Sequence, residues 1–134
     1  IPFILHDVPV RLDRPALLMR DASKYLASLN SPAKIHYFDP YLIHFLNMDP
    51  FDTTLSACGV KDRKQPSKKM GPNDVLVWDA HFGPNEGGVS LENVMRDPHL
   101  QLIKTFLPAE KFQVLGGYDY GIYIFCKTKD PGRK

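Results

Sequence analysis

The chain has 134 residues, 43% of them hydrophobic and 24% charged, which fits one globular domain with a core. Its formal net charge of +2 argues against a dedicated nucleic-acid binder. No apolar run approaches the roughly 20 residues that a membrane span needs, and no signal peptide is visible. Because the chain begins at Ile1 and not at Met, we expect it to be a fragment of a longer protein.

The first helix is predicted from its capping residues and its periodicity. Residues 1–12 are apolar with two prolines, and we expect a linker or an edge segment there. Asp13 is a candidate N-cap, with Pro15 in the first helical turn. Apolar residues then follow at helical spacing: Leu18, Ala22, Tyr25, Leu26 and Leu29. Asn30 and Pro32 are expected to end this helix.

A strand at 34–38 comes next, followed by a second helix and a long polar connection. Asp39 and Pro40 repeat the cap-and-proline pattern and predict a short helix. Residues 49–73 show no clear period, and loops of this length are usually functional or disordered. Their stretch 61–69 carries five basic residues and one acid, and it has too few apolar residues to bury much surface. We therefore expect this loop to be mobile.

The second half of the chain predicts three more strands and one helix. Residues 75–78 form a short apolar strand. The pair Asp97 and Pro98 predicts the start of a helix. This helix would carry Leu100, Leu102, Ile103 and Phe106. Residues 111–115 and 122–127 are the last two strands, separated by a glycine-containing turn.

The element order α-β-α-β-α-β-β predicts an α/β fold. We expect a small three-layer α/β/α domain over residues 1–134, with a mixed sheet that is mostly parallel. The strand at 75–78 should be central in this sheet. The last two strands lie too close in sequence for a crossover, so they should pair as a C-terminal antiparallel hairpin.

The stretch 74–88 is the place where a ligand site is expected. It leads from the apolar strand directly into a loop, and in open α/β sheets ligands collect at the carboxyl ends of strands. If the strands at 34–38 and 75–78 are parallel, their carboxyl ends share one edge of the sheet. The polar residues gathered there would be Asp39, His44, Asp79, His81 and Glu86.

Two kinds of chemistry compete with a structural role for these residues. A zinc or manganese site would use Asp79, His81 and Glu86, with Asp39 or His44 as a fourth ligand. An acid/base site would pair Asp79 or Glu86 with His81, but no nucleophile motif accompanies them. The structural interpretation, in which Asp79 caps the following turn and Asp39 caps a helix, is preferred. No catalytic residue, metal ligand or cofactor is therefore assigned.

Glycines and tyrosines supply further candidates. Gly83, Gly87 and Gly88 match neither a P-loop nor a dinucleotide fingerprint, and turn dihedral angles explain them. Tyr118 and Tyr120 lie in the turn before the last strand. They are candidates for stacking on a sugar ring, although exposed tyrosines are common in turns.

The charge is distributed unevenly along the chain. The basic stretch 61–69 and the basic tail 127–134 are either solvated segments or contacts for phosphates and anionic lipid headgroups. Cys58 and Cys126 lack metal-ligand spacing, and the sequence leaves their disulfide state open.

Four segments together resemble one family: 36–42 (HYFDPYL), 47–52 (NMDPFD), 77–88 (VWDAHFGPNEGG) and 123–127 (YIFCK). They are similar to the soluble C-terminal region of Bacteroidetes membrane mannosyltransferase-like proteins. These are multi-span glycosyltransferases of the GT-C type, similar to the dolichyl-phosphate-mannose-dependent class. The resemblance covers nearly the whole chain, and the block 77–88 is its most specific part.

The resemblance implies transfer of a sugar from a polyprenyl-phosphate donor to an acceptor at the extracytoplasmic, periplasmic face of the inner membrane. The catalytic acid of such enzymes lies in the membrane part, so this chain would be a non-catalytic accessory domain without a cofactor. Its partners would be the membrane portion of the same polypeptide, a lipid-linked sugar or glycan acceptor, and anionic lipid headgroups, with no nucleic acid.

Two other functions remain open. One is a stand-alone small α/β enzyme that acts through Asp79, His81 and Glu86, with or without a metal. The other is a protein interaction domain. Several apolar spans of about 20 residues upstream in the parent reading frame would favour the glycosyltransferase.

Overall fold

The computed structural model describes residues 13–29 and 33–128. The predicted linker at 1–12, the helix stop at Asn30 and Pro32, and most of the basic tail lie outside the described residues. No helix within the described ranges is long and apolar enough to cross a membrane.

A five-stranded mixed sheet forms the middle layer, in the order β2-β1-β3-β7-β4. Its strands are β1 (Ile35–Tyr37), β2 (Ser56–Cys58), β3 (Val75–Asp79), β4 (Leu100–Phe106) and β7 (Ile122–Lys127). The first three are mutually parallel, and β7 runs antiparallel to both β3 and β4, so four of the five strands share one direction. The predicted α/β class, the mostly parallel mixed sheet and the central position of β3 are confirmed.

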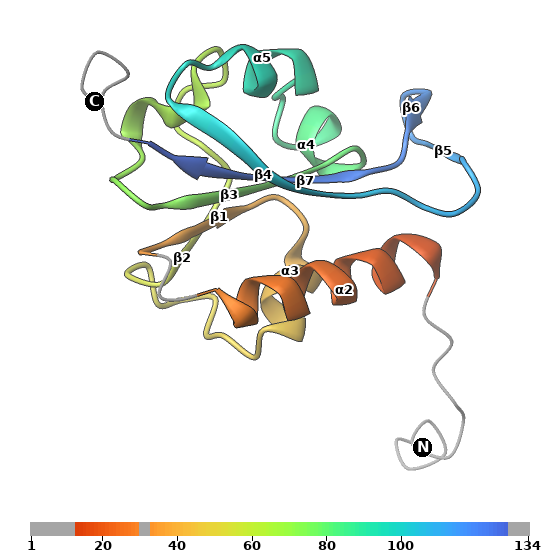
Figure 1. Ribbon diagram of the computed structural model, residues 1–134, viewed down its shortest axis with the longest axis horizontal. Coiled ribbons are helices and arrows are strands. Elements are labelled where there is room, and N and C mark those ends of the chain that lie inside the picture. Colours follow the sequence, from red (N-terminus) through yellow and green to blue (C-terminus); the bar gives the residue numbers. More distant parts are fainter. Residues whose placement is uncertain (1–12, 30–32, 129–134) are drawn as a thin grey trace.

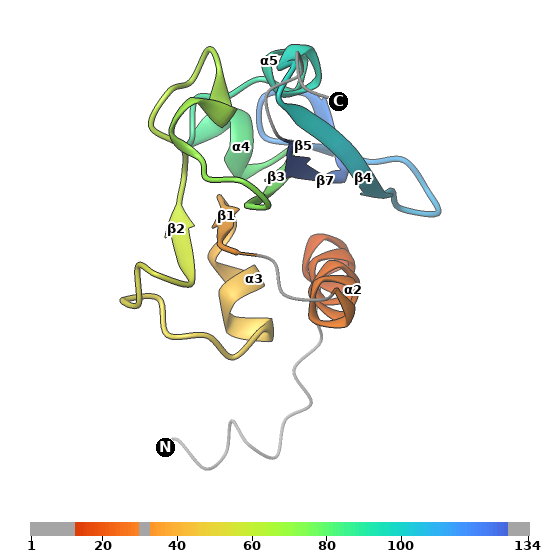
Figure 2. The same ribbon diagram turned by 60° about the vertical axis from the view of Figure 1, so that its left-hand side comes forward.

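Helices cover both faces of the sheet (Figures 1 and 2). On one face lie α2 (Arg14–Ser28) and α3 (Pro40–Phe45), and on the other lie α4 (Phe82–Asn85) and α5 (Leu91–Arg96). All five residues of β3 are buried, because this strand is central in the sheet and covered on both sides. The three-layer arrangement is therefore as predicted.

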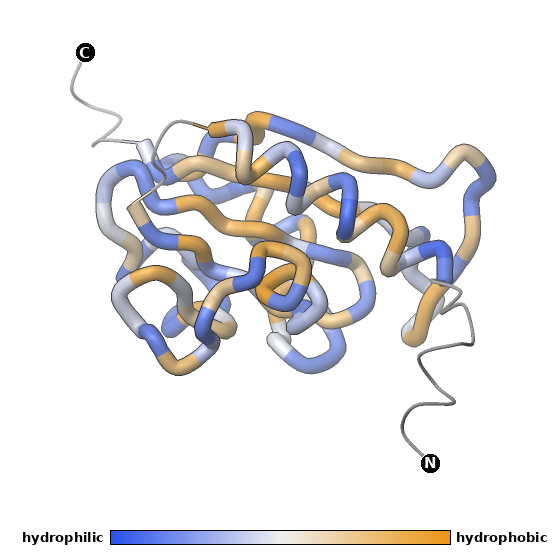
Figure 3. The backbone as a smooth tube through the Cα atoms, turned by 90° about the horizontal axis from the view of Figure 1, so that it is seen from below, coloured by the Kyte–Doolittle hydropathy of each residue, from blue (hydrophilic) through white to orange (hydrophobic). Residues whose placement is uncertain are grey.

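The capping residues predicted for the first two helices are confirmed. The Oδ1 atom of Asp13 accepts a hydrogen bond from Ala16 N at 2.9 Å, and Oδ1 of Asp39 accepts one from Tyr41 N at 2.9 Å. Figure 3 shows hydrophobic and hydrophilic residues interspersed along α2, as in an amphipathic helix. The buried face of α2 consists of Ala16, Met19, Ala22, Ser23 and Leu26.

The predicted helix that starts at Asp97 is wrong, because residues 100–106 form strand β4. A register shift between Leu102 and Lys104 interrupts the pairing of β4 with β7. Such a bulge breaks the period-2 alternation that marks a strand, so the apolar residues imitate helical spacing. Asp97 is the C-cap residue of α5, and its carboxylate accepts hydrogen bonds from Ser67 N and Ser67 Oγ at 2.8 and 2.7 Å.

The prediction that 111–115 pairs with 122–127 is also wrong, because each of these segments pairs with another strand. Strand β7 lies between β3 and β4 in the main sheet. The antiparallel hairpin is formed instead by β5 (Gln113–Val114) and β6 (Tyr118–Asp119). Strand β7 is apolar on both faces, and only a position covered on both sides buries such a strand.

The connection 49–73 has more structure than its sequence predicted. It contains the edge strand β2 and a short 3-10 helix, η1 (Pro66–Lys69). Pro66, Ser67 and Met70 are buried, although the basic residues beside them are exposed. The expectation that the stretch 61–69 buries little surface therefore holds for its basic residues but fails at Pro66 and Ser67, and its mobility stays a prediction.

Candidate functional site at the carboxyl edge of the sheet

Strands β1 and β3 bring Asp39 and Asp79 to the same edge, as predicted. Tyr37 pairs with Val77 in parallel register, and each aspartate lies two residues beyond its strand's member of that pair. The two side chains are 4% and 0% exposed. Two carboxyl groups are thus buried next to each other at the carboxyl ends of neighbouring strands.

One oxygen of Asp79 caps the turn that leads into α4. Oδ2 accepts hydrogen bonds from His81 N at 3.2 Å and from Phe82 N at 2.8 Å. This is the structural role that the sequence favoured for Asp79. Its Oδ1 atom, however, is buried and has no hydrogen-bond partner among the described residues. The capping role therefore uses only one of the two carboxylate oxygen atoms.

Burial dominates the titration of both aspartates. Desolvation and, to a smaller extent, the charge of Asp39 raise the pKa of Asp79 to about 7, although hydrogen bonds from the Phe82 and His81 N–H groups oppose this rise. Desolvation also raises the pKa of Asp39, while the hydrogen bond from Tyr41 N and the charge of His81 lower it. The pair therefore holds a proton near neutral pH more readily than ordinary carboxyl groups do.

Tyr120 completes this group of buried polar side chains. It is 2% exposed, and its hydroxyl has no hydrogen-bond partner among the described residues. Desolvation raises the pKa of Tyr120 far above its usual value, and the charges of Asp79, Asp39 and Asp13 add to this effect. Its hydroxyl therefore stays protonated close to the two carboxyl groups. We call Asp39, Asp79 and Tyr120 the acidic cluster.

An aromatic column holds the Tyr120 ring in place. Phe112 stacks on Tyr120 with ring centroids 5.3 Å apart and an interplanar angle of 14°. The Arg14 guanidinium lies 4.1 Å from the centroid of the Phe112 ring. Because this face of Tyr120 is taken by protein, the predicted stacking of a sugar ring on it is not available there. Tyr118, in contrast, is 44% exposed.

The other predicted site residues lie elsewhere or play smaller parts. His81 is half-buried, with its ring 4.6 Å from the Phe82 ring, and it is close enough to Asp39 to lower the pKa of that carboxyl group. Glu86 is exposed, and its charge adds to the effect of burial in raising the pKa of Cys58. His44 is exposed on α3, with its ring 5.8 Å from that of Phe45.

The metal site considered from the sequence is not formed by the described residues. No group of three or more His, Cys, Asp or Glu side chains within 13–29 and 33–128 is arranged to hold a metal ion. Glu86 is exposed, whereas Asp79 is buried. Burial raises the pKa of the thiols of Cys58 and Cys126, both of which are free, so neither is an activated thiolate.

Packing explains the glycines in the block 77–88. The indole Nε1 of Trp78 donates a hydrogen bond to Val89 O at 2.8 Å. A Cβ atom on Gly83 would collide with the Trp78 ring, and one on Gly87 would collide with the Phe38 ring. Close contact thus explains these two glycines, and only Gly88, with φ +67°, has the left-handed backbone expected of a turn.

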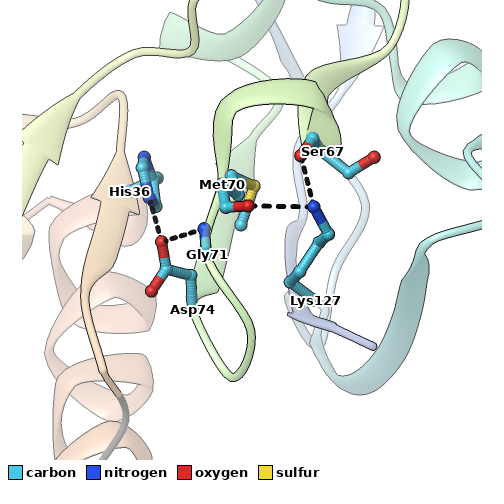
Figure 4. Close-up of polar contacts among 6 residues, drawn as sticks. All are labelled: His36, Ser67, Met70, Gly71, Asp74 and Lys127. Carbon is cyan, nitrogen blue, oxygen red and sulfur yellow. Dashed lines mark hydrogen bonds and ion pairs between the residues drawn. The ribbon is translucent and has the colours of Figure 1, made fainter. Parts of the chain in front are cut away.

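A second polar region, which the sequence did not predict, lies around Asp74 (Figure 4). Oδ2 of Asp74 accepts a hydrogen bond from Gly71 N at 2.8 Å and lies 3.0 Å from His36 Nε2. The Lys127 ammonium donates to the carbonyl oxygens of Ser67 and Met70 at 2.8 and 2.9 Å. These residues come from segments far apart in the chain, so no local pattern could reveal them.

Comparisons of the chain with family models, with curated proteins and with solved structures found no match. The fold, the acidic cluster and the region around Asp74 are therefore the structural basis for inferring a function. The acidic cluster can hold a proton near neutral pH. Asp39, Asp79 and Tyr120 are all nearly inaccessible to solvent, so a substrate cannot contact them in this conformation.

Proposed function

We propose that this chain is an extracytoplasmic accessory domain of a membrane glycosyltransferase of the mannosyltransferase-like GT-C type. The parent enzyme would use a polyprenyl-phosphate sugar donor, and this domain alone would not be catalytic. The observation that carries the proposal is the structural use of the block 77–88, the most specific part of the resemblance. In this block, Trp78 donates a buried hydrogen bond and Asp79 caps a turn. Its glycines leave room for the rings of Trp78 and Phe38.

The burial of the acidic cluster supports the non-catalytic part of this proposal. A general base in glycosyl transfer must come within hydrogen-bond reach of the acceptor hydroxyl. The Asp39 and Asp79 side chains are 4% and 0% exposed, so an acceptor would have to displace protein to reach them. A catalytic carboxylate in another part of the parent enzyme fits this arrangement better.

Exposed apolar side chains support a contact with the membrane portion of the same polypeptide. Phe51 is 89% exposed, Tyr41 52% and Leu55 46%. The Tyr41 ring is stacked on Phe45 at 6.2 Å. Large exposed apolar side chains are typical of protein and membrane contact sites. A domain attached to a membrane enzyme on the periplasmic side would use such side chains for docking.

The rival function is a stand-alone enzyme that uses Asp79 as an acid or base, and one observation favours it. Burial raises the pKa of Asp79 to about 7, the range that suits acid/base catalysis at neutral pH. In this alternative a conformational change would have to open the acidic cluster to a substrate.

The test is a transfer and hydrolysis assay with the purified chain, a polyprenyl-phosphate sugar or a nucleotide sugar, and an acceptor glycan. We expect no turnover above the protein-free control. In the parent enzyme, deletion of this domain should reduce transfer, and Asp79→Asn should leave it nearly unchanged. Turnover by the isolated chain that disappears in Asp79→Asn would overturn the accessory-domain proposal in favour of the stand-alone enzyme.

A further inference from the structure

A cavity of about 160 Å³ lies beside the edge of the sheet formed by β1 and β2. It is lined by residues of β1, the end of β2, the loop that follows β2, and η1. Three of its lining residues are lysines: Lys34, which precedes β1, and Lys61 and Lys69 from the basic stretch 61–69. His36 and Cys58 also contribute to the wall. We call this cavity the lysine pocket.

The three lysines give the lysine pocket an excess of positive charge. None of them forms an ion pair with a carboxylate of residues 13–29 or 33–128. Lys68, their neighbour in sequence, does pair with Asp62, at 3.7 Å. Three carboxylates lie near the pocket: Asp62, which follows Lys61 in the chain; Asp74, which is held by His36 and Gly71; and Glu86, whose charge adds to burial in raising the pKa of Cys58. None of these carboxylates lines the cavity.

The wall that carries Lys69 is fixed by buried contacts before any ligand arrives. Ser67 is 0% exposed and bonds through both its N–H and its hydroxyl to Asp97. The Lys127 ammonium holds the carbonyl oxygens of Ser67 and Met70 (Figure 4). A wall ordered in advance lowers the entropic cost of binding, because the ligand does not have to order the loop.

The part of the wall that β1 and the loop after β2 form is fixed in a similar way. His36 is 8% exposed, and its Nε2 atom lies 3.0 Å from the Asp74 carboxylate. Figure 4 marks this contact with a dashed line. Gly59 follows β2 with φ +81°, and its N–H group donates to Tyr37 O at 2.6 Å. The backbone on both sides of the cavity is thus held by hydrogen bonds, while the lysine side chains remain able to adjust.

We propose that the lysine pocket binds a phosphate group. Lysine ammonium groups bind phosphate as point charges, and three of them around one cavity attract its negative charge. The volume is below the roughly 300 Å³ at which cavities begin to enclose whole drug-sized ligands. A phosphate group therefore fits the cavity, and the molecule that carries it extends outside. This site stands on the cavity and its charges, and it does not depend on the proposed function.

The phosphate has two sources: a soluble phosphate or phosphomonoester, and the headgroup of an anionic lipid. The experiment uses the whole chain at low ionic strength in two arms. The first arm titrates inorganic phosphate and follows the backbone amide signals of Gly59 and Met70 by NMR. The second arm measures cosedimentation with phosphatidylcholine vesicles that contain or lack phosphatidylglycerol.

Two variants with the same charge change provide the comparison. Lys61→Gln/Lys69→Gln removes two lysines of the lysine pocket, and Lys64→Gln/Lys68→Gln removes two lysines of the same segment that do not line it. The first variant should bind about 30-fold more weakly and the second within about twofold of the parent. Lys34→Gln removes a cation from a different segment and should also weaken binding. Thermal melts confirm that each variant is folded.

Each result either supports or overturns the proposal. Saturable phosphate binding that only the pocket variants lose supports a site for soluble phosphate. Vesicle binding that only the pocket variants lose, and that free phosphate competes away, supports a lipid headgroup. Equal losses in the two double variants, or no saturable binding in either arm, would show that the lysines are only a solvated basic segment.

Discussion

The acidic cluster and the lysine pocket lie at the same sheet, but their ionisable side chains differ in solvent exposure. In the acidic cluster, ionisable groups are buried to 4% exposure or less, and desolvation controls their protonation. In the lysine pocket, Lys61 and Lys69 remain exposed. The hydrogen bonds that fix its wall are formed by Ser67 with Asp97 and Lys127. Charges in the first region should therefore act on stability, and charges in the second on binding.

The largest expected effect is the pH dependence caused by Asp79. Its pKa rises from 3.8 to about 7 on folding, so the folded state binds more protons than the unfolded state between these values. The stabilising proton is fully bound below pH 3.8 and is lost as pH rises through about 7. The free energy of unfolding should therefore fall over this window by up to about 4 kcal/mol. Urea unfolding at several pH values measures this.

Two substitutions separate the charge of Asp79 from its capping role. Asp79→Asn keeps an oxygen for the N–H groups of His81 and Phe82 but removes the charge, so it should flatten the pH dependence and stabilise the protein above pH 7. Asp79→Ala also removes the acceptor and should cost roughly 1 to 3 kcal/mol at low pH. A pH profile of Asp79→Asn that still falls as steeply as that of the parent would place the titration on another group, Asp39 first.

The next largest effect concerns the packing beside the acidic cluster. Gly83→Ala brings a Cβ atom into the Trp78 ring and should destabilise the protein by about 1 to 3 kcal/mol. Gly71→Ala is the matched control, because its Cβ atom would lie 3.6 Å from the Asp74 carboxylate, an ordinary contact. Thermal melts should show a clear loss for Gly83→Ala and little change for Gly71→Ala. Equal melting temperatures would mean that the Trp78 ring has room to move.

Local signals in the sequence were sufficient where one short segment determines the structure. Asp13 and Asp39 were recognised as helix caps, because a cap is a contact over two or three residues. The strand β3 was recognised by its unbroken apolar run, and its central place follows from burial on both faces.

Tertiary context decided the features that were missed. The register shift in β4 hid its alternation, and only the neighbouring strands fix the place of β7. The three residues of β2 are too few to give a period. The lysine pocket forms because the fold brings Lys34 and Lys69 to one cavity. The acidic cluster includes Tyr120 because this residue is buried, whereas its sequence position predicts an exposed turn.

A smaller effect is expected behind the lysine pocket, where the Lys127 ammonium donates hydrogen bonds to two backbone carbonyl groups. Lys127→Met keeps much of the apolar stem but leaves the carbonyl oxygens of Ser67 and Met70 without their donor. The expected cost is about 1 to 2 kcal/mol. Lys111→Met is the control, since its ion pair with Asp119 is largely exposed and should contribute little. A change of similar size in both variants would argue against a specific role for Lys127.

The smallest effect on stability is expected for the lysines of the pocket themselves. Lys61→Gln/Lys69→Gln should change the free energy of unfolding by less than about 0.5 kcal/mol in buffer without phosphate, because both side chains are exposed. Relief of repulsion among the three lysines should make this change neutral or slightly stabilising. Added phosphate should then raise the melting temperature of the parent, since a ligand that binds only the folded state stabilises it, but not that of the variant. A variant that phosphate stabilises as much as the parent would place the phosphate outside the lysine pocket. A variant that is strongly destabilised without phosphate would show that these lysines act on folding, as the groups of the acidic cluster do, and the contrast between the two regions would fail.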